Sequence, residues 1–242
     1  MSFLEESWED REEKAYREIF GDTGPGIYQL SNEIFSRMNA KSVDPRWLTH
    51  GVFMCPPYGN RSSWAYVTSG MSNPWEAEEP AEFSGLGVEF LMETENEEIW
   101  AIEVLQTLMV YNLLLVSGQM GEFPPLDYGH RVPLALSDSI KAMMFVHPAK
   151  FQSTFAIKSG KVDLLQVVGI TPAELAAAKQ SSSDELSKLI INVTGGLITK
   201  KGTSQCSVNR ITRRCTRTKL RAASLWFATQ TLPQACRTQF GR

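Results

Sequence analysis

The sequence predicts an α+β fold over its first 200 residues. Several segments rich in aromatic and β-branched residues have the length of β-strands, and residues 97–116 carry apolar side chains at helical spacing. The two kinds of segment are mixed without the strict alternation of a doubly wound sheet. With 242 residues, of which 43% are hydrophobic and 21% charged, the chain has an ordinary globular composition and needs no metal or disulfide to build a core.

The first predicted element is a helix over residues 7–20, supported by opposite charges three or four residues apart. Its sparse apolar face is expected to consist of Trp8, Ala15, Ile19 and Phe20. The turn sequence GDTGPG at residues 21–26 ends this helix. Residues 27–39 are expected to form either a second short helix or an irregular strap.

Seven later segments have the composition of strands, and Pro or Gly ends several of them. They are residues 51–55, 64–68, 85–94, 142–148, 153–157, 161–168 and 197–199. Between the second and third of these strands, residues 73–82 form a Pro- and Glu-rich loop with Glu76, Glu78, Glu79 and Glu82. These glutamates lack the spacing of a calcium loop and are interpreted as a hydrated surface.

The helix predicted over 97–116 is apolar on most of its surface, so we expect it to lie centrally in the fold. It contains Glu103, Gln106 and Asn112, which are costly in lipid, and is therefore interpreted as a buried helix and not as a membrane span. Residues 117–133, rich in Gly and Pro, predict a loop. Two further helices are expected to begin at Thr171 and Ser182, each with a Glu placed to close a capping box.

Charge is distributed unevenly along the chain. Nine of the 24 basic residues and none of the 27 acidic residues fall in 201–242, which leaves 15 basic against 27 acidic in residues 1–200, a net charge of −12. The N-terminus lacks the features of a signal peptide, and the first 200 residues contain one cysteine, Cys55. We therefore expect a cytoplasmic protein with an acidic body and an atypical basic tail.

Motifs for catalysis or cofactor binding are absent from the sequence. The pair Gly85 and Gly87 lacks the third glycine of a nucleotide loop, and there is no GxSxG or HExxH motif. The histidines His50, His130 and His147 are far apart in the chain, so only the fold could gather them into a metal or catalytic site. The sequence therefore predicts no cofactor, no metal and no small-molecule substrate.

Five segments in order resemble the suppressor of fused domain family. They are Trp64–Ser72 (WAYVTSGMS), Gly85–Phe90 (GLGVEF), the long helix up to Tyr111, Gly129–Leu134 (GHRVPL), and Leu164–Leu175 (LLQVVGITPAEL). Each segment is weakly specific alone, but their common order over residues 27–200 is more specific. The resemblance implies an α+β fold with a mixed β-sheet packed by helices, similar to the N-terminal domain of the family.

The resemblance also implies a non-enzymatic protein-binding role. The short chain is similar to bacterial single-domain members, some of which are thought to be immunity proteins that neutralise a toxin. An acidic body suits this hypothesis, because it would steer a basic toxin surface toward it. We expect the chain to act without the second, C-terminal domain with which the animal member clamps a peptide. No membrane or nucleic-acid partner is expected for the body.

The family's partner-contacting surface can be placed only in part. Tyr111 matches a partner-contacting tyrosine. In the family's Gly/His segment, Gly129 replaces the acidic residue that precedes His130, and Asp127, two residues earlier, is the candidate substitute for it. Trp64 and Tyr66 complete the candidate binding residues. The alternatives are a core position for Tyr111, sheet packing for Trp64 and Tyr66, and a loop-capping pair for Asp127 and His130.

Two other functions remain open. The first is an enzyme whose site forms around Asp127 and His130, beside Glu89. The second is an adaptor that binds nucleic acid or membrane through residues 201–242, with an amphipathic helix over 218–230. The tail could instead be the product of a shifted reading frame, which we favour because 42 residues without any acidic side chain are unusual.

Overall fold

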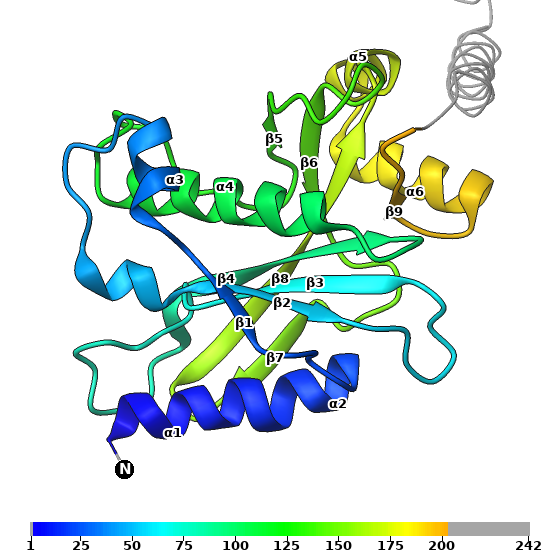
Figure 1. Cartoon of the computed structure of the whole chain (residues 1–242). Coiled ribbons are helices and arrows are strands. Elements are labelled where there is room, and N and C mark those ends of the chain that lie inside the picture. Colours follow the sequence, from blue (N-terminus) through cyan, green and yellow to red (C-terminus); the bar gives the residue numbers. More distant parts are fainter. Residues whose placement is uncertain (1, 203–242) are drawn as a thin grey trace, which may run out of the picture.

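The computed structural model describes residues 2–202 and confirms the predicted α+β class. These residues form one nine-stranded mixed sheet with helices packed on it (Figure 1). The helical elements are α1 (Phe3–Glu9), the π-helix η1 (Asp10–Ala15), α2 (Tyr16–Phe20), α3 (Asn32–Arg37), the 3-10 helix η2 (Pro45–Thr49), α4 (Ile99–Val116), α5 (Pro172–Gln180) and α6 (Ser183–Thr194).

The sheet has the strand order β1-β2-β3-β4-β8-β6-β5, with β7 paired to β8 and β9 paired to β4. Its strands are β1 (Ile27–Gln29), β2 (Gly51–Cys55), β3 (Trp64–Ser69), β4 (Phe83–Thr94), β5 (Arg131–Val132), β6 (Ala142–Val146), β7 (Thr154–Ile157), β8 (Gly160–Ile170) and β9 (Ile198–Thr199). Pairs β4–β8 and β4–β9 are parallel, whereas the remaining pairs are antiparallel.

Alternation along the strands divides the buried apolar residues into three clusters, one on the α4 face of the sheet and two on the opposite face. On β2, Val52 and Met54 face α4, whereas Phe53 and Cys55 face the N-terminal helix. On β6, the alternate residues face α4 and α6. Because both faces of the sheet are covered, its central strands are largely buried on both sides, as the 85–94 segment predicted.

α4 is the central helix, and twelve of its 18 residues are buried. It is the one helix in residues 2–202 that is long and apolar enough to span a membrane, but it packs on β2, β3 and β4 in the core (Figure 1). This confirms the prediction of a buried helix. Its polar side chains are placed by specific partners, as described below for Asn112.

The N-terminal helical segment differs from the prediction in the face that it buries. Its middle turn is a π-helix, which changes the angular relation of the turns on either side. The buried side chains are Ser7, Arg11, Tyr16 and Phe20, whereas Trp8, Ala15 and Ile19 are only half-buried. Tyr16 and the charged Arg11 were therefore missed by the apolar pattern.

Three other local predictions are refined by the structure. Residues 27–39 contain both a strand, β1, and a helix, α3. The capping box at Thr171 is complete, but at Ser182 only the Ser hydroxyl bonds to the N–H of Glu185, without the reciprocal bond. The loop predicted over 117–133 ends in the short strand β5. The predicted 218–230 helix lies outside the described residues, as does nearly all of the basic tail.

Candidate functional site

Tyr111 and His130, two of the five predicted site residues, line the same surface groove. This groove, of about 290 Å³, lies between the C-terminal half of α4 and residues 123–133. Tyr111 and Leu115 form its α4 wall. The exposed Phe123 and the half-buried His130 lie on the loop wall. Asp127 is exposed on the same loop, close to His130. Tyr111 is half-buried and therefore combines core packing with a surface open to a partner.

Trp64 and Tyr66 lie elsewhere. The Tyr66 side chain is fully buried, and its hydroxyl accepts a 2.6 Å hydrogen bond from the backbone N–H of Glu98 at the start of α4. Burial raises the pKa of Tyr66, so the hydroxyl stays neutral. At 1.5 Å per residue, the start of α4 is about 20 Å from Tyr111. The structure thus places Tyr66 in the sheet packing that was its alternative, with its hydroxyl at the start of α4. Trp64, half-buried beside the same core, does not reach the groove.

The turn from Asp127 to His130 is held by its own hydrogen bonds. His130 Nδ1 accepts from the Asp127 backbone N–H at 3.1 Å, and the Asp127 carboxylate accepts from the Tyr128 N–H at 2.7 Å. Gly129 has φ +85°, a conformation that favours glycine. Because Nδ1 is an acceptor, the neutral imidazole carries its proton on Nε2 and can donate one hydrogen bond from there. This geometry favours a turn-capping pair over an acid–base pair.

Two buried polar residues position the loop wall of the groove. On α4, Asn112 Oδ1 accepts from the Leu126 N–H at 2.8 Å. At the start of α6, Ser183 Oγ donates to the Gly129 carbonyl and accepts from Arg131 Nη1, both at 2.7 Å. A buried amide in an apolar helix must find a partner, and that signal in the sequence could have identified Asn112. Nothing in the sequence singled out Ser183.

The groove lies beside an open sheet edge. β5 is a terminal strand of the described sheet and pairs only with β6. At the opposite end, Gln106 of α4 donates to the carbonyls of Tyr28 and Gln29 at 3.0 and 2.9 Å, which satisfies backbone groups of β1. An unpaired strand edge can accept an added strand. Phe123, 67% exposed, flanks this edge and offers an apolar contact.

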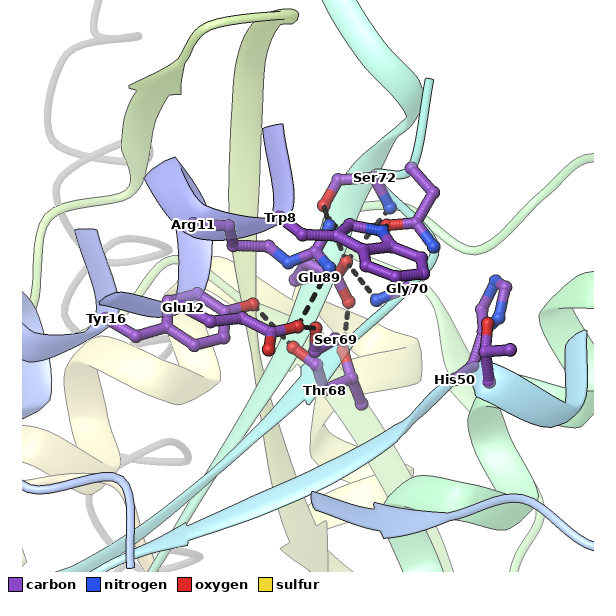
Figure 2. Close-up of polar contacts among 12 residues, drawn as sticks. Trp8, Arg11, Glu12, Tyr16, His50, Thr68, Ser69, Gly70, Ser72 and Glu89 are labelled. Atoms are coloured by element: carbon purple, nitrogen blue, oxygen red, sulfur yellow. Dashed lines mark hydrogen bonds and ion pairs between the residues drawn. The ribbon is translucent and has the colours of Figure 1, made fainter. Parts of the chain in front are cut away.

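A second group of polar residues lies under the N-terminal helix and forms a buried network (Figure 2). The fully buried Glu89 carboxylate accepts from the backbone N–H groups of Gly70 and Ser72, at 3.0 and 2.9 Å. It also accepts from the hydroxyls of Ser72 and Thr68, at 2.7 and 2.6 Å. Four donors thus compensate a charge that would otherwise be costly to bury.

The N-terminal helix completes this network from outside the sheet. Arg11 Nη1 donates to Ser72 Oγ at 3.1 Å, and so a hydroxyl bridges Arg11 to Glu89. Arg11 also contacts Glu12 at 3.1 Å, which accepts from Ser69 Oγ at 2.6 Å. The Tyr16 hydroxyl donates to the Thr68 carbonyl at 2.5 Å. Most of these polar groups are paired within the network, with Arg11 Nε as an exception, and the bonds of Arg11, Glu12 and Tyr16 join the helix to the sheet. The network is therefore best explained as structural.

The three histidines stay apart. His50 is buried against Gly70 and Trp75, and His147 stacks on Tyr128 with ring centroids 3.8 Å apart. Glu89 is not among the residues that line the groove with His130. Within residues 2–202 there is no group of three or more His, Cys, Asp or Glu side chains that could hold a metal. The convergence that the enzyme hypothesis requires is therefore not seen in this part of the chain.

These features define an α+β domain with a shallow surface site beside an open strand edge. A scan against family models matched residues 47–202 to the family described as suppressor of fused protein (SUFU). Because this match covers more than half of the chain, the protein belongs to the suppressor of fused family, which confirms the prediction. A search of curated proteins found no match.

The chain is similar to solved structures at low sequence identity. The crystal structure of the Sufu–Fu complex matches with a TM-score of 0.55 and 17% identity, over 76% of this chain and 91% of that chain. Drosophila Suppressor of Fused matches with a TM-score of 0.54 and 18% identity, over 70% of this chain and 44% of that chain. A suppressor of fused homologue from Neisseria gonorrhoeae FA 1090 matches with a TM-score of 0.46 and 18% identity, over 64% and 76%.

Proposed function

We propose that this chain is a non-enzymatic binding module that receives an extended segment of a protein partner in the groove beside β5. The observation that carries the proposal is the juxtaposition of an unpaired strand edge with apolar groove walls. The edge offers backbone hydrogen bonds, and Tyr111 and Phe123 offer apolar contacts. The Sufu–Fu complex supports it, since that structural relative was solved with a protein partner.

The finer part of the proposal concerns the partner. We propose a bacterial toxin with a basic surface, which the chain neutralises in the cytoplasm by covering it. The net charge of −12 over residues 1–200 supports a basic partner, because a field of that sign raises the association rate of a cation-rich protein. A free and buried Cys55, with no disulfide in the described residues, suits a reducing compartment.

A co-purification experiment tests the groove. The wild-type chain is used to isolate its partner from the source cell, and the isolated partner is then titrated against two variants. Phe123→Lys changes an exposed aromatic residue at the groove. Tyr58→Lys makes the same change at an aromatic residue 58% exposed in the β2–β3 connection, outside the groove lining.

We expect Phe123→Lys to weaken binding at least fivefold, since truncation of an interface aromatic costs on the order of 1–3 kcal/mol. Tyr58→Lys is expected to bind as the wild type does. Equal affinities of all three proteins would contradict the groove as the binding site. For the toxin hypothesis, co-expression of the partner should arrest growth with Phe123→Lys but not with the wild type; harmless expression of the partner alone would refute it.

A further inference from the structure

A second pocket lies on the other side of the C-terminal end of α4. It measures about 150 Å³ and is lined mainly by apolar atoms, among them those of Trp47, Trp75, Leu86 and Val116. We call it the Trp75 pocket. A cavity of this size accommodates a molecule such as benzene, and therefore one branched or aromatic side chain. Leu86 is 36% and Val116 45% exposed, which leaves an apolar rim open to solvent.

Trp75 is held in an uncommon backbone conformation. Its φ is +40°, in the left-handed region that bulky residues rarely occupy. Its ring stacks on His50, with centroids 5.7 Å apart and planes at 23°, and the Arg46 guanidinium lies 5.3 Å from its centroid. Such strain in a surface loop is typical of positions that serve recognition. Burial lowers the pKa of His50 to about 4, so the pocket wall is uncharged at neutral pH.

The loop beside the Trp75 pocket is strongly acidic. Trp75 and Leu86 are the two ends of a segment that carries exposed Glu76, Glu78, Glu79 and Glu82 and contains no Lys or Arg. Arg46 pairs with Glu76 at 2.5 Å and with Asp44 at 2.6 Å. Within the described chain, the other three glutamates of this segment form no ion pair. The loop bonds at its Glu82 end to Ser159 and Lys161 of the β7–β8 hairpin, and it carries a net negative charge between its two pocket-lining ends. An apolar cavity beside a loop of this charge is complementary to an apolar side chain that has basic neighbours.

The Trp75 pocket and the groove share the last turns of α4. Leu113 and Val116 line the pocket, whereas Tyr111 and Leu115 line the groove. A helix with its side chains is about 10–12 Å across, and four or five extended residues cover somewhat more than that distance. One partner could therefore occupy both sites at once.

We propose that the Trp75 pocket is a second contact site for the protein partner, and that it takes one apolar side chain flanked by lysine or arginine. This inference rests on the proposed binding function and specifies the chemistry of the partner. The groove supplies the strand edge, and the pocket supplies an anchor and a charge preference. The net negative charge of the 76–82 loop disfavours partners with an acidic segment at this position.

A peptide titration followed by NMR tests the pocket by itself. The probe is the peptide acetyl-Lys-Arg-Leu-Leu-Arg-Lys-amide, and the signals are the indole N–H resonances of Trp47 and Trp75 in the full chain. Two control peptides replace the leucines by serine or the basic residues by glutamate. We expect saturable shifts of both indole signals with the first peptide, and at least tenfold weaker binding of either control.

Matched variants distinguish the pocket from a general charge effect. Val116→Lys changes the pocket rim, and Ile99→Lys makes the same change at a residue 57% exposed at the opposite end of α4. The first should weaken the peptide at least fivefold, and the second should leave it unchanged. Absence of saturable shifts, equal binding of the glutamate peptide, or equal effects of the two variants would overturn the proposal. Phe123→Lys should not affect the peptide, so failure of the pocket and failure of the groove give different results.

Discussion

Replacement of Glu89 by alanine should strongly destabilise the protein. The carboxylate is fully buried and accepts four hydrogen bonds of 2.6–3.0 Å, two of them from the backbone of Gly70 and Ser72. The hydroxyl donors of Thr68 and Ser72 can rotate toward other acceptors, but the two backbone N–H groups cannot. Each buried N–H without a partner costs about 1–3 kcal/mol, so Glu89→Ala should lose roughly 2–6 kcal/mol of unfolding free energy.

Glu89→Gln gives a finer test of the same network. The amide oxygen can keep the three bonds that Oε1 accepts, whereas the bond from Thr68 and the charge facing Arg11 through Ser72 are lost. We expect a smaller loss of about 1–3 kcal/mol. Glu103→Ala, at an exposed position of α4, is the matched control and should change stability by less than about 0.5 kcal/mol.

Urea denaturation of the four proteins measures these differences, provided that the slope m is unchanged. A typical domain has only about 5–15 kcal/mol of stability, so Glu89→Ala should shift the midpoint by a readily measured amount. If Glu89→Ala and Glu103→Ala unfold within about 1 kcal/mol of each other, the network does not hold the N-terminal helix to the sheet as described.

Three further predictions concern pH, reactivity and the tail. Burial lowers the pKa of His50 from 6.5 to about 4, so as the pH falls the unfolded chain binds a proton at this histidine before the folded chain does. The free energy of unfolding should therefore decrease by about 3 kcal/mol between pH 6.5 and 4. Denaturation at a series of pH values should show that His50→Gln removes this part of the pH dependence. Burial also raises the pKa of the Cys55 thiol to about 12. In a chain ending at Gly202, a thiol reagent at pH 7 should therefore modify Cys55 only as fast as the protein unfolds. Rapid labelling of the native state would contradict this. The same shortened chain should match the full chain in urea midpoint and partner affinity, because β9 already completes the described sheet; loss of binding would favour a functional basic arm.

Local signals in the sequence predicted the elements well. α4 was found from its apolar spacing, and α5 from the Thr171 capping box, because both signals reside in residues a few positions apart. Strand order could not be predicted, since the parallel pairing of β4 with β8 joins segments about 75 residues apart. The two-residue strand β5 had no period to detect, and it forms only because β6 is beside it.

The candidate site was predicted less completely, for the same reason. The resemblance identified Tyr111 and His130 as candidate site residues, and both line the same groove in the structure. The sequence left Tyr66 open between a partner contact and sheet packing, because an aromatic residue in a strand can face either solvent or core. In the structure it is buried, and its hydroxyl is used at the start of α4. The burial of Arg11 depends on Ser72 and Asn73, some 60 residues away, and so the local pattern of the helix could not indicate it.

Hydrogen–deuterium exchange of the chain with its isolated partner tests most directly whether the groove is the working surface. Binding should slow amide exchange in residues 123–133, with the largest effect at β5, because an added strand would bond to its free edge. Exchange in α1 and α2, on the opposite face of the sheet, should not change. Protection confined to the N-terminal helix, or absent from β5, would contradict the account.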